Sequence, residues 1–223
     1  MINIVFEHKD WLIVDKPEGL NFHSEDNEAG LIVLLEKQLG CKLWPVHRLD
    51  KLTSGLLIVA KSKQACAQLC ELFASRLVEK YYLAVVSASL KKKQGLIKGD
   101  MEKSRRGAFK LVKTQNNPAI TQFFSASIKP GLRLCLLKPK TGKTHQLRVA
   151  LKSQGSAILG DVLYSGEAAK RMYLHSYALS FTYQNEIFEI VSDSVFEPDF
   201  ELNAVIEEQK WSQPWLIKWP LIK

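Results

Sequence analysis

Residues 47–62 read HRLDKLTSGLLIVAKS, in which a charged tetrapeptide and a polar turn lead into a continuous apolar run. The run, residues 56–61, has the length and composition of a buried strand. Ser62 follows it as a favourable N-cap residue for a helix. Behind this cap, apolar side chains recur at positions i, i+4, i+7 and i+8, namely Ala65, Leu69, Leu72 and Phe73. The segment therefore predicts a core strand that is entered from a charged loop and followed by an amphipathic helix ending near Arg76.

Strand-like segments outnumber helical ones in the rest of the chain. Short runs rich in β-branched and aromatic residues predict strands at 2–6, 11–15, 81–87, 119–127, 132–138, 173–183 and 186–192. Gln184 and Asn185 lie between the last two and predict a hairpin turn. Helices are predicted at 29–39, ending at Gly40, and at 143–153. Successive hairpins with few helices indicate an α+β fold with a largely antiparallel or mixed sheet.

The composition is that of a globular protein with one main domain. The chain has 223 residues, of which 46% are hydrophobic and 24% charged, and this excludes disordered and collagen-like classes. No apolar run approaches the roughly 18 residues of a membrane-spanning helix, and the N-terminal residues do not resemble a signal peptide. Four cysteines are too few and too scattered for a disulfide framework. We therefore expect a cytoplasmic protein with no membrane association.

Positive charge is concentrated in one segment. The chain carries a formal net charge of +8, and residues 89–113 contain nine Lys and Arg against two acidic residues, Asp100 and Glu102. By contrast, residues 172–209 contain eight Asp and Glu and no Lys or Arg. A solvated charged face explains such a run, but a basic loop bracketed by predicted strands is also a suitable surface for nucleic acid. The segment lacks the apolar helical face of a membrane anchor.

Asp50 is the first candidate for chemistry. It lies between Arg48 and Lys51 on a loop that leads into the core strand, and nearby positive charges favour the ionised carboxylate. An ionised aspartate in this setting can act as a nucleophile. The competing interpretation is structural: Asp50 caps a turn and Arg48 forms a surface ion pair.

Residues 141–149, reading TGKTHQLRV, form a second polar cluster. The triplet at 142–144 resembles the end of a phosphate-binding P-loop, but that motif needs glycine at the position of Leu137. This excludes a nucleotide cofactor bound in that way. The histidines at 47, 145 and 175 lack the spacing of a metal site, so no metal is expected.

Several motifs together resemble the RluA branch of the pseudouridine synthases. Besides residues 47–62, they are LIVDKPEGL at 12–20, EKYYLA at 79–84, TGKTHQLR at 141–148 with Gly160-Asp161 and Tyr164, and LHS at 174–176. The matches extend from about residue 4 to residue 190, and HRLD with THQLR in one chain is a specific combination. Asp15, Lys143 and Ala150 depart from the residues most common in that family.

The resemblance implies a domain organisation. Residues 1–196 would form a single catalytic domain whose large, mixed, mostly antiparallel sheet is flanked by helices and loops around an RNA-binding cleft. The basic segment at about 89–113 would be an insertion, and residues 197–223, which contain Trp211, Trp215 and Trp219, a C-terminal extension packed on or near the core. We expect a monomer.

The resemblance also implies a reaction. Pseudouridine formation breaks the N1–C1′ bond of a uridine in RNA, turns the bound uracil and joins C5 to C1′, without a metal or redox cofactor. Asp50 would be the essential carboxylate, and Arg148 would form a salt bridge that orients it. Tyr82 would lie against the uracil and take part in removing the C5 proton, whereas Tyr81 would point to the other side of the strand.

RNA binding would involve further residues. The uridine must be flipped out of its helix, and the planar guanidinium of Arg48 suits the vacated position while His47 supports the loop. The resemblance and the charge distribution assign further RNA contacts to Thr144, His145, Gln146, Leu174, Lys91, Lys92, Lys93, Arg105 and Arg106. The expected substrate is ribosomal or transfer RNA.

Two other functions remain compatible with these residues. A non-catalytic RNA-binding or RNA-folding protein would keep the basic surface without turnover. A glycoside or nucleoside hydrolase would use Asp50 with a second carboxylate, for which Asp161 is the candidate, although Gly160-Asp161 is more simply a turn.

Overall fold

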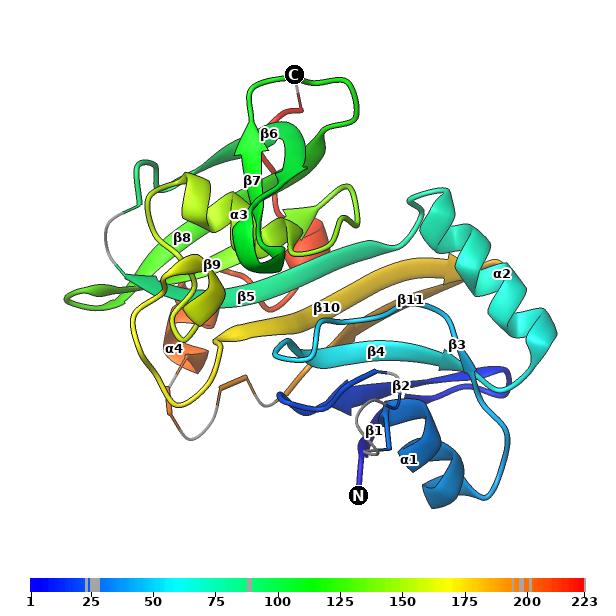
Figure 1. Cartoon of the computed structure of the whole chain (residues 1–223). Helices are drawn as coiled ribbons and strands as arrows, with labels where there is room; N and C mark the ends of the chain where they lie inside the picture. The colour runs from blue at the N-terminus through cyan, green and yellow to red at the C-terminus, as the bar shows by residue number, and fades with distance from the viewer. Residues whose placement is uncertain are drawn as a thin grey trace. The chain divides into compact units, whose positions relative to one another are not determined.

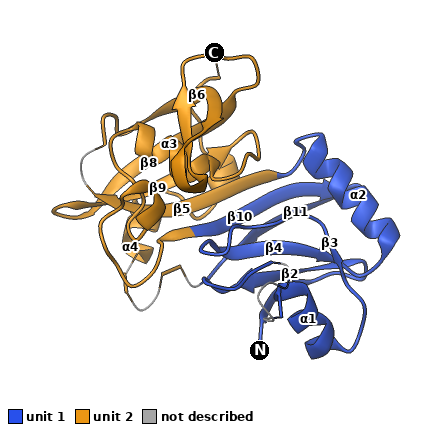
Figure 2. Ribbon diagram, in the orientation of Figure 1, with its two compact units in different colours: residues 1–78, 175–193 blue, residues 79–174, 194–223 orange. Residues whose placement is uncertain are grey.

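The fold was obtained as a computed structural model that describes residues 1–22, 24, 29–87, 90–193, 195–196, 199–200 and 202–222 (Figure 1). The chain divides into two compact units (Figure 2). Unit 1 comprises residues 1–78 and 175–193, and unit 2 comprises residues 79–174 and 194–223. Ser89 and Glu197, at which the predicted basic segment and C-terminal extension begin, lie outside the described residues.

Unit 1 is built on a mixed sheet. The central strands follow the order β1 (Asn3–Glu7), β2 (Trp11–Lys16), β4 (Ser54–Ala60) and β10 (Leu174–Tyr183), with β11 (Glu186–Val191) paired to β10 and β3 (Trp44–Pro45) paired to β4. The β4–β10 pair is parallel and the other pairs of this unit are antiparallel. Helices α1 (Leu31–Leu39) and α2 (Lys63–Ala74) complete the unit.

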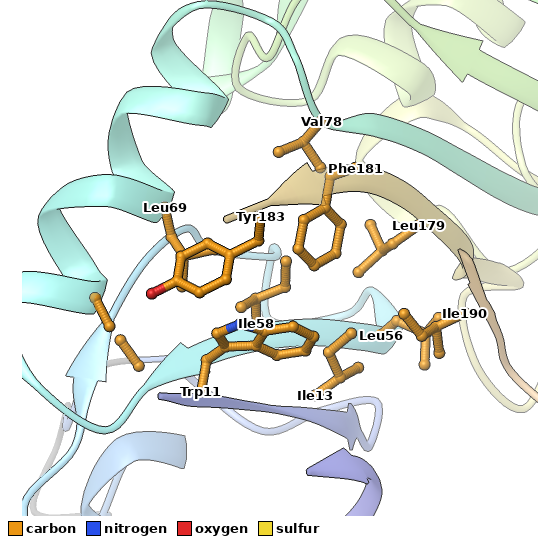
Figure 3. Packing of buried hydrophobic residues seen from close by; sticks show 12 residues of the cluster. Trp11, Ile13, Leu56, Ile58, Leu69, Val78, Leu179, Phe181, Tyr183 and Ile190 are labelled. Atoms are coloured by element: carbon orange, nitrogen blue, oxygen red, sulfur yellow. The ribbon is translucent and has the colours of Figure 1, made fainter. Parts of the chain in front are cut away.

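The core of unit 1 follows from the two-residue period of its strands. Trp11 and Ile13 of β2 lie with Leu56 and Ile58 of β4 in one buried cluster (Figure 3). The cluster is completed by further side chains from β4, α2, β10, β11 and the segment after α2: Ala60, Ala65, Leu69, Val78, Leu179, Phe181, Tyr183 and Ile190. The predicted amphipathic stripe of α2 thus packs on this face of the sheet.

Local signals fix the ends of these elements. The Ser62 hydroxyl accepts a hydrogen bond from Ala65 N at the start of α2. Gly40 ends α1 in the left-handed conformation, with φ of 66°. Gln184 and Asn185 have φ of 50° and 67°, as the two central residues of a tight β-hairpin turn require.

Unit 2 contains an antiparallel sheet. Its strands follow the order β5 (Glu79–Ser87), β9 (Leu132–Pro139), β8 (Ala119–Lys129), β6 (Gln94–Lys103) and β7 (Phe109–Val112). Two α-helices, α3 (Gln146–Ser153) and α4 (Asn203–Glu208), belong to this unit. Three short 3₁₀ turns accompany them: η1 (Arg105–Gly107), η2 (Val162–Tyr164) and η3 (Pro214–Leu216).

The expectation of a basic loop between residues 89 and 113 is wrong. Most of this segment forms β6 and β7, which pair with each other from Asp100 opposite Val112 to Lys103 opposite Phe109. The strand signal is hidden because charged side chains occupy the exposed positions, which leaves few apolar residues to reveal the two-residue period.

The tryptophans of the C-terminal segment do not share one helix. Helix α4 ends at Glu208, and η3 begins at Pro214, whose ring prevents a longer regular helix. Trp211 is buried. The Trp219 ring lies 5.8 Å from the Tyr81 ring and 5.2 Å from the Phe124 ring, measured between centroids, so this segment packs against β5 and β8.

The predicted α+β class with a mixed, mostly antiparallel sheet is confirmed. Among the residues with described positions, no helix is both long and apolar enough to span a membrane.

Gly55 provides a test of the packing beneath the charged loop. It has φ of +106°, and a Cβ placed on it would lie 2.4 Å from the carbonyl oxygen of Ser176. We expect Gly55→Ala to lower the free energy of unfolding by about 3 kcal/mol or more, because backbone strain and a steric clash add. Urea denaturation monitored by circular dichroism measures this change.

Gly131 is the matched control. Its φ is +84°, but nothing lies within 4 Å of the position of its Cβ. Gly131→Ala should therefore cost only the conformational penalty of about 1–2 kcal/mol. Equal losses for the two variants would contradict the close approach of β4 to β10.

Candidate active site

The HRLD loop of unit 1 is anchored by alternate side chains. His47 Nε2 accepts a hydrogen bond from Ile58 N at 3.0 Å, and the His47 ring stacks on Phe73 with 4.3 Å between centroids. Leu49 is buried, whereas Arg48 is exposed and Asp50 is partly exposed. The loop therefore presents its cation and its carboxylate while its other two side chains hold it to the core.

The turn that follows Asp50 is fixed through its backbone. Thr53 N donates to the Asp50 carbonyl oxygen at 3.0 Å, and Gly19 N donates to the carbonyl oxygen of Lys51 at 3.0 Å. Lys16, which is fully buried, donates from Nζ to the carbonyl oxygens of Pro17, Leu20 and Lys51 at 2.8–3.0 Å. One ammonium group thus ties the segment after β2 to the residue next to Asp50, a contact that the sequence analysis did not anticipate.

The start of β4 is fixed by a histidine. His175 Nδ1 lies 2.8 Å from Ser54 Oγ, and its Nε2 lies 3.0 Å from Ser192 Oγ. Both ring nitrogens of this buried side chain therefore engage hydroxyl groups. Nowhere in the described part of the chain do three or more His, Cys, Asp or Glu side chains form a group suited to hold a metal ion.

In unit 2, Tyr82 is held within β5. Its side chain is 8% exposed, and its backbone lies opposite Leu137 of β9. Successive side chains of a strand point to opposite faces, so Tyr81 and Tyr82 are separated as predicted from the sequence. Tyr81 packs near Trp219 and donates its hydroxyl proton to the Glu79 carboxylate.

Glu79 is the centre of a charge cluster on the Tyr81 side. Its carboxylate lies 2.6 Å from Lys138 Nζ and 3.1 Å from Lys140 Nζ. Burial alone would raise the pKa of Glu79, but hydrogen bonds from Lys138, Tyr81 and Lys140 outweigh it and hold the pKa at about 2. The Glu79 carboxylate therefore stays ionised across the physiological pH range.

Arg148 of α3 forms a buried bidentate ion pair with Asp161. Its Nε lies 2.8 Å from Oδ2 and its Nη2 lies 2.7 Å from Oδ1. Asp161 is fully buried and Arg148 is 4% exposed. The guanidinium carbon also lies 4.9 Å from the centre of the Tyr164 ring. Two parallel hydrogen bonds and a stacked ring leave this guanidinium a single orientation.

The segment that precedes α3 is organised by Gln146. Its amide nitrogen donates to Ile120 O and Thr121 Oγ1, and its amide oxygen accepts from Thr141 Oγ1 and Lys143 N. All four hydrogen-bonding positions of the amide are thus occupied within the protein, which leaves this side chain no donor or acceptor for RNA. The neighbouring Thr144 is exposed and His145 is partly exposed, with φ of 58°.

The remaining predicted RNA contacts differ in exposure. Leu174 is buried, with 3% of its surface accessible. The predicted cations of the basic segment are exposed, and they are Lys91, Lys92, Lys93, Arg105 and Arg106. Lys91 also donates from Nζ to the carbonyl oxygen of Ser153 at the end of α3.

The two units contain different functional groups. Unit 1 presents the carboxylate of Asp50 on a tethered loop. Unit 2 contains the buried phenol of Tyr82 in β5, the guanidinium of Arg148 held by two hydrogen bonds to Asp161, and several exposed cations. The partnership of Asp50 with Arg148, expected from the sequence, stays a prediction.

Comparison with known proteins identifies the family. A family model described as RNA pseudouridylate synthase matches residues 10–153. An uncharacterized RNA pseudouridine synthase of Haemophilus influenzae is 52% identical over 192 residues, covering 85% of this chain and 86% of its own. The chain belongs to the RNA pseudouridine synthase family.

More distant similarities agree with this assignment. Ribosomal large subunit pseudouridine synthase D of Borreliella burgdorferi is 32% identical, with 92% of this chain and 72% of its own covered. The solved structure of human RNA Pseudouridylate Synthase Domain Containing 1 superposes with a TM-score of 0.77 at 24% identity, covering 94% of this chain and 95% of that chain, and supports the fold.

The protein is therefore an RNA pseudouridine synthase, an isomerase whose substrate is RNA. None of these similarities supports the alternative of a non-catalytic RNA-binding protein. The predicted family, enzyme class and RNA substrate are confirmed.

The role of Asp161 as the partner of Arg148 was not predicted from the sequence. Gly160-Asp161 does form a turn, because Asp161 N donates to Ile158 O, but its carboxylate also binds Arg148. A usable signal existed: an arginine on the apolar helix predicted at 143–153 requires a nearby carboxylate if it is buried.

Removing the Asp161 carboxylate tests the importance of this pair. Asp161→Ala leaves the buried Arg148 guanidinium without its partner, so we expect the free energy of unfolding to fall by about 3–5 kcal/mol. Urea denaturation measures the loss. Glu102→Ala, which breaks an exposed pair with Lys110, should change stability by less than about 1 kcal/mol. A similarly small effect of Asp161→Ala would contradict the structural importance of the buried Arg148–Asp161 pair.

The Glu79 cluster predicts a pH dependence of stability. Because its pKa is lowered from 4.5 to about 2, the ionised carboxylate stabilises the fold above about pH 4.5, and this stabilisation is lost as the pH falls through about 2. The difference in unfolding free energy between the wild type and Glu79→Gln should therefore shrink between pH 5 and pH 2. A difference that stays constant over this range in urea titrations would be inconsistent with a lowered pKa.

Proposed function

We propose that this synthase converts a specific uridine of a structured ribosomal or transfer RNA into pseudouridine, with Asp50 as the essential carboxylate. The observation that carries the proposal is the tethering of the HRLD loop, in which Leu49 is buried, His47 is bound to Ile58 N and Asp50 is partly exposed. Ribosomal RNA of the large subunit is favoured, because relatives from Borreliella burgdorferi and Rickettsia bellii are named as synthases that act there.

Asp50 is proposed to act at the ribose. Cleavage of the N1–C1′ bond leaves C1′ electron-poor, and an ionised carboxylate stabilises or attacks such a carbon as in the glycosidases. The uracil then turns and C5 bonds to C1′. The C5 proton is released and N1 regains a proton, so that atoms and charges balance without an oxidant or reductant.

Arg148 is proposed to orient Asp50 during the reaction. The family resemblance supplies this pairing. It is supported by the Asp161 contacts, which engage Nε and Nη2 of Arg148 and thereby fix the direction of the whole guanidinium. A fixed cation keeps a carboxylate ionised after RNA has displaced water from around it.

Tyr82 is proposed to contact the uracil and to assist removal of the C5 proton. Its low exposure and its place in a paired strand limit its motion, which suits a group that must meet one face of a base. A phenol is also a suitable acid–base group for a proton transfer within the site.

Binding of the RNA is proposed to depend on exposed cations. Arg48 would occupy the space that the flipped uridine leaves, because a planar guanidinium stacks on bases and also binds phosphate. The exposed cations of residues 91–93 and 105–106 would attract phosphates regardless of sequence.

The organisation of the active protein is also a proposal. Residues 1–196 would act as the catalytic domain and residues 197–223 as an extension packed on it, which the ring contacts of Trp219 support. We propose that the protein works as a monomer in the cytoplasm, where ribosomal and transfer RNAs are available.

Tritium release tests the proposed roles. The purified protein is incubated with RNA containing uridine labelled with tritium at C5, and pseudouridine formation releases the label into water. Asp50→Asn should lower the rate by on the order of 10³-fold or more, because it removes the charge on which the chemistry depends. Asp193→Asn, which alters an exposed carboxylate of unit 1, should leave the rate unchanged.

The competing functions give different outcomes in the same assay. Free uracil as the product would indicate a hydrolase. RNA binding without tritium release by the wild type would indicate a binding protein. Retention of activity by Asp50→Asn would overturn the assignment of the carboxylate.

A further inference from the structure

The basic hairpin, defined as residues 94–112, leaves the sheet of unit 2 halfway along β6. Residues 94–99 of β6 pair with β8, whereas residues 100–103 pair with β7. The outer half of the hairpin therefore lacks the β8 partner of the inner half. Its exposed cations lie in this outer half: Lys103, Arg105, Arg106 and Lys110.

The base of the basic hairpin is rigid. A Cβ on Gly99 would lie 2.3 Å from Val112 O, so the two strands approach as closely as only glycine allows. The Asp100 carboxylate accepts hydrogen bonds from the backbone of Asn116 and Asn117, each at 2.9 Å. The direction of the hairpin is thus set at its base, but its outer half needs a second contact to be held in place.

Tyr164 provides that second contact. Phe109, the first residue of β7, donates its backbone N–H to Tyr164 Oη at 3.0 Å. The same hydroxyl lies 3.0 Å from His145 Nδ1, and the His145 ring meets the Phe109 ring edge to face at 5.9 Å. These contacts join the hairpin to the start of α3, and Figure 1 shows β7 beside that helix.

The two ends of the Tyr164 side chain have different partners. The hydroxyl binds the hairpin and His145, while the ring lies under the Arg148 guanidinium at 4.9 Å. Tyr164 is 5% exposed, so water does not compete readily for its hydroxyl. Replacing tyrosine by phenylalanine removes the contact with the hairpin and keeps the ring beside Arg148.

We propose that Tyr164 is a positioning residue. It holds the basic hairpin in the orientation in which the cations of the hairpin bind the phosphates of structured RNA. The inference rests on the proposed RNA-binding role of the exposed cations. The role of Tyr164 is to orient the hairpin, and no contact with the uridine is assigned to it. It determines affinity for RNA that reaches the outer half of the hairpin.

Salt dependence of RNA binding tests the proposal. A fluorescently labelled RNA stem-loop is titrated with protein at several KCl concentrations, and the slope of log K against log [KCl] reports the number of phosphate contacts. Replacing both Arg105 and Arg106 by alanine should reduce the slope by about 2. Tyr164→Phe should reduce it by about 1–2, with a several-fold loss of affinity at ~0.1 M salt, because the hairpin no longer presents these side chains together.

A triple variant shows whether Tyr164 affects RNA binding through the hairpin cations or independently of them. If Tyr164 acts through the basic hairpin, adding Tyr164→Phe to the double arginine variant should change the slope by less than about 0.5. Additive changes, or an unchanged slope in Tyr164→Phe, would overturn the proposal. Tyr183→Phe is the control, because it removes a buried hydroxyl that binds Gln68 in unit 1, and it should bind RNA as the wild type does.

Hydrogen exchange distinguishes loss of the contact from loss of the fold. In Tyr164→Phe, amides of residues 103–110 should exchange faster, while those of β9 keep their wild-type rates. Equal acceleration in both regions would overturn the proposal. Since these measurements concern binding, absence of tritium release by the wild type would overturn the proposed function and leave this inference standing.

Discussion

The buried pair of Arg148 and Asp161 is the constraint on which the site in unit 2 depends. Burying two charges is costly, and the cost is recovered only with good geometry and further hydrogen bonds. Both hydrogen bonds of the pair are 2.7–2.8 Å long. Gly160 precedes Asp161 in the turn that begins at Ile158, and a Cβ on this glycine would lie 1.8 Å from Arg171 O. The tightly packed backbone of this turn therefore places the Asp161 carboxylate where it holds the Arg148 guanidinium.

Unit 1 uses backbone contacts for a comparable purpose. Lys16 binds the carbonyl oxygens of three residues, one of which is Lys51 next to Asp50. His47 binds β4 through its ring, and Leu49 is buried. Backbone hydrogen bonds, the His47 ring and the buried Leu49 thus hold the loop that carries Asp50. Such preorganisation lets a charged side chain remain available to a substrate.

Much of this arrangement could be predicted from the sequence where the signal is local. The Ser62 cap and the Gln184-Asn185 turn are properties of a few adjacent residues, and both occur as expected. The basic hairpin escaped prediction because charged side chains hide its alternation. The partner of Arg148 lies 13 residues away across a turn, and a pattern of residue types does not record such a pairing. The flanking cations made Asp50 a candidate and the family resemblance implied its catalytic role, but neither predicted the contacts that hold its loop.

The most direct test is a map of pseudouridine in the RNA of cells with and without this protein. The account predicts that at least one uridine of ribosomal or transfer RNA is pseudouridine in normal cells and unmodified uridine in cells lacking the protein, and that the wild-type gene restores it. An identical set of pseudouridines in both kinds of cell would contradict it.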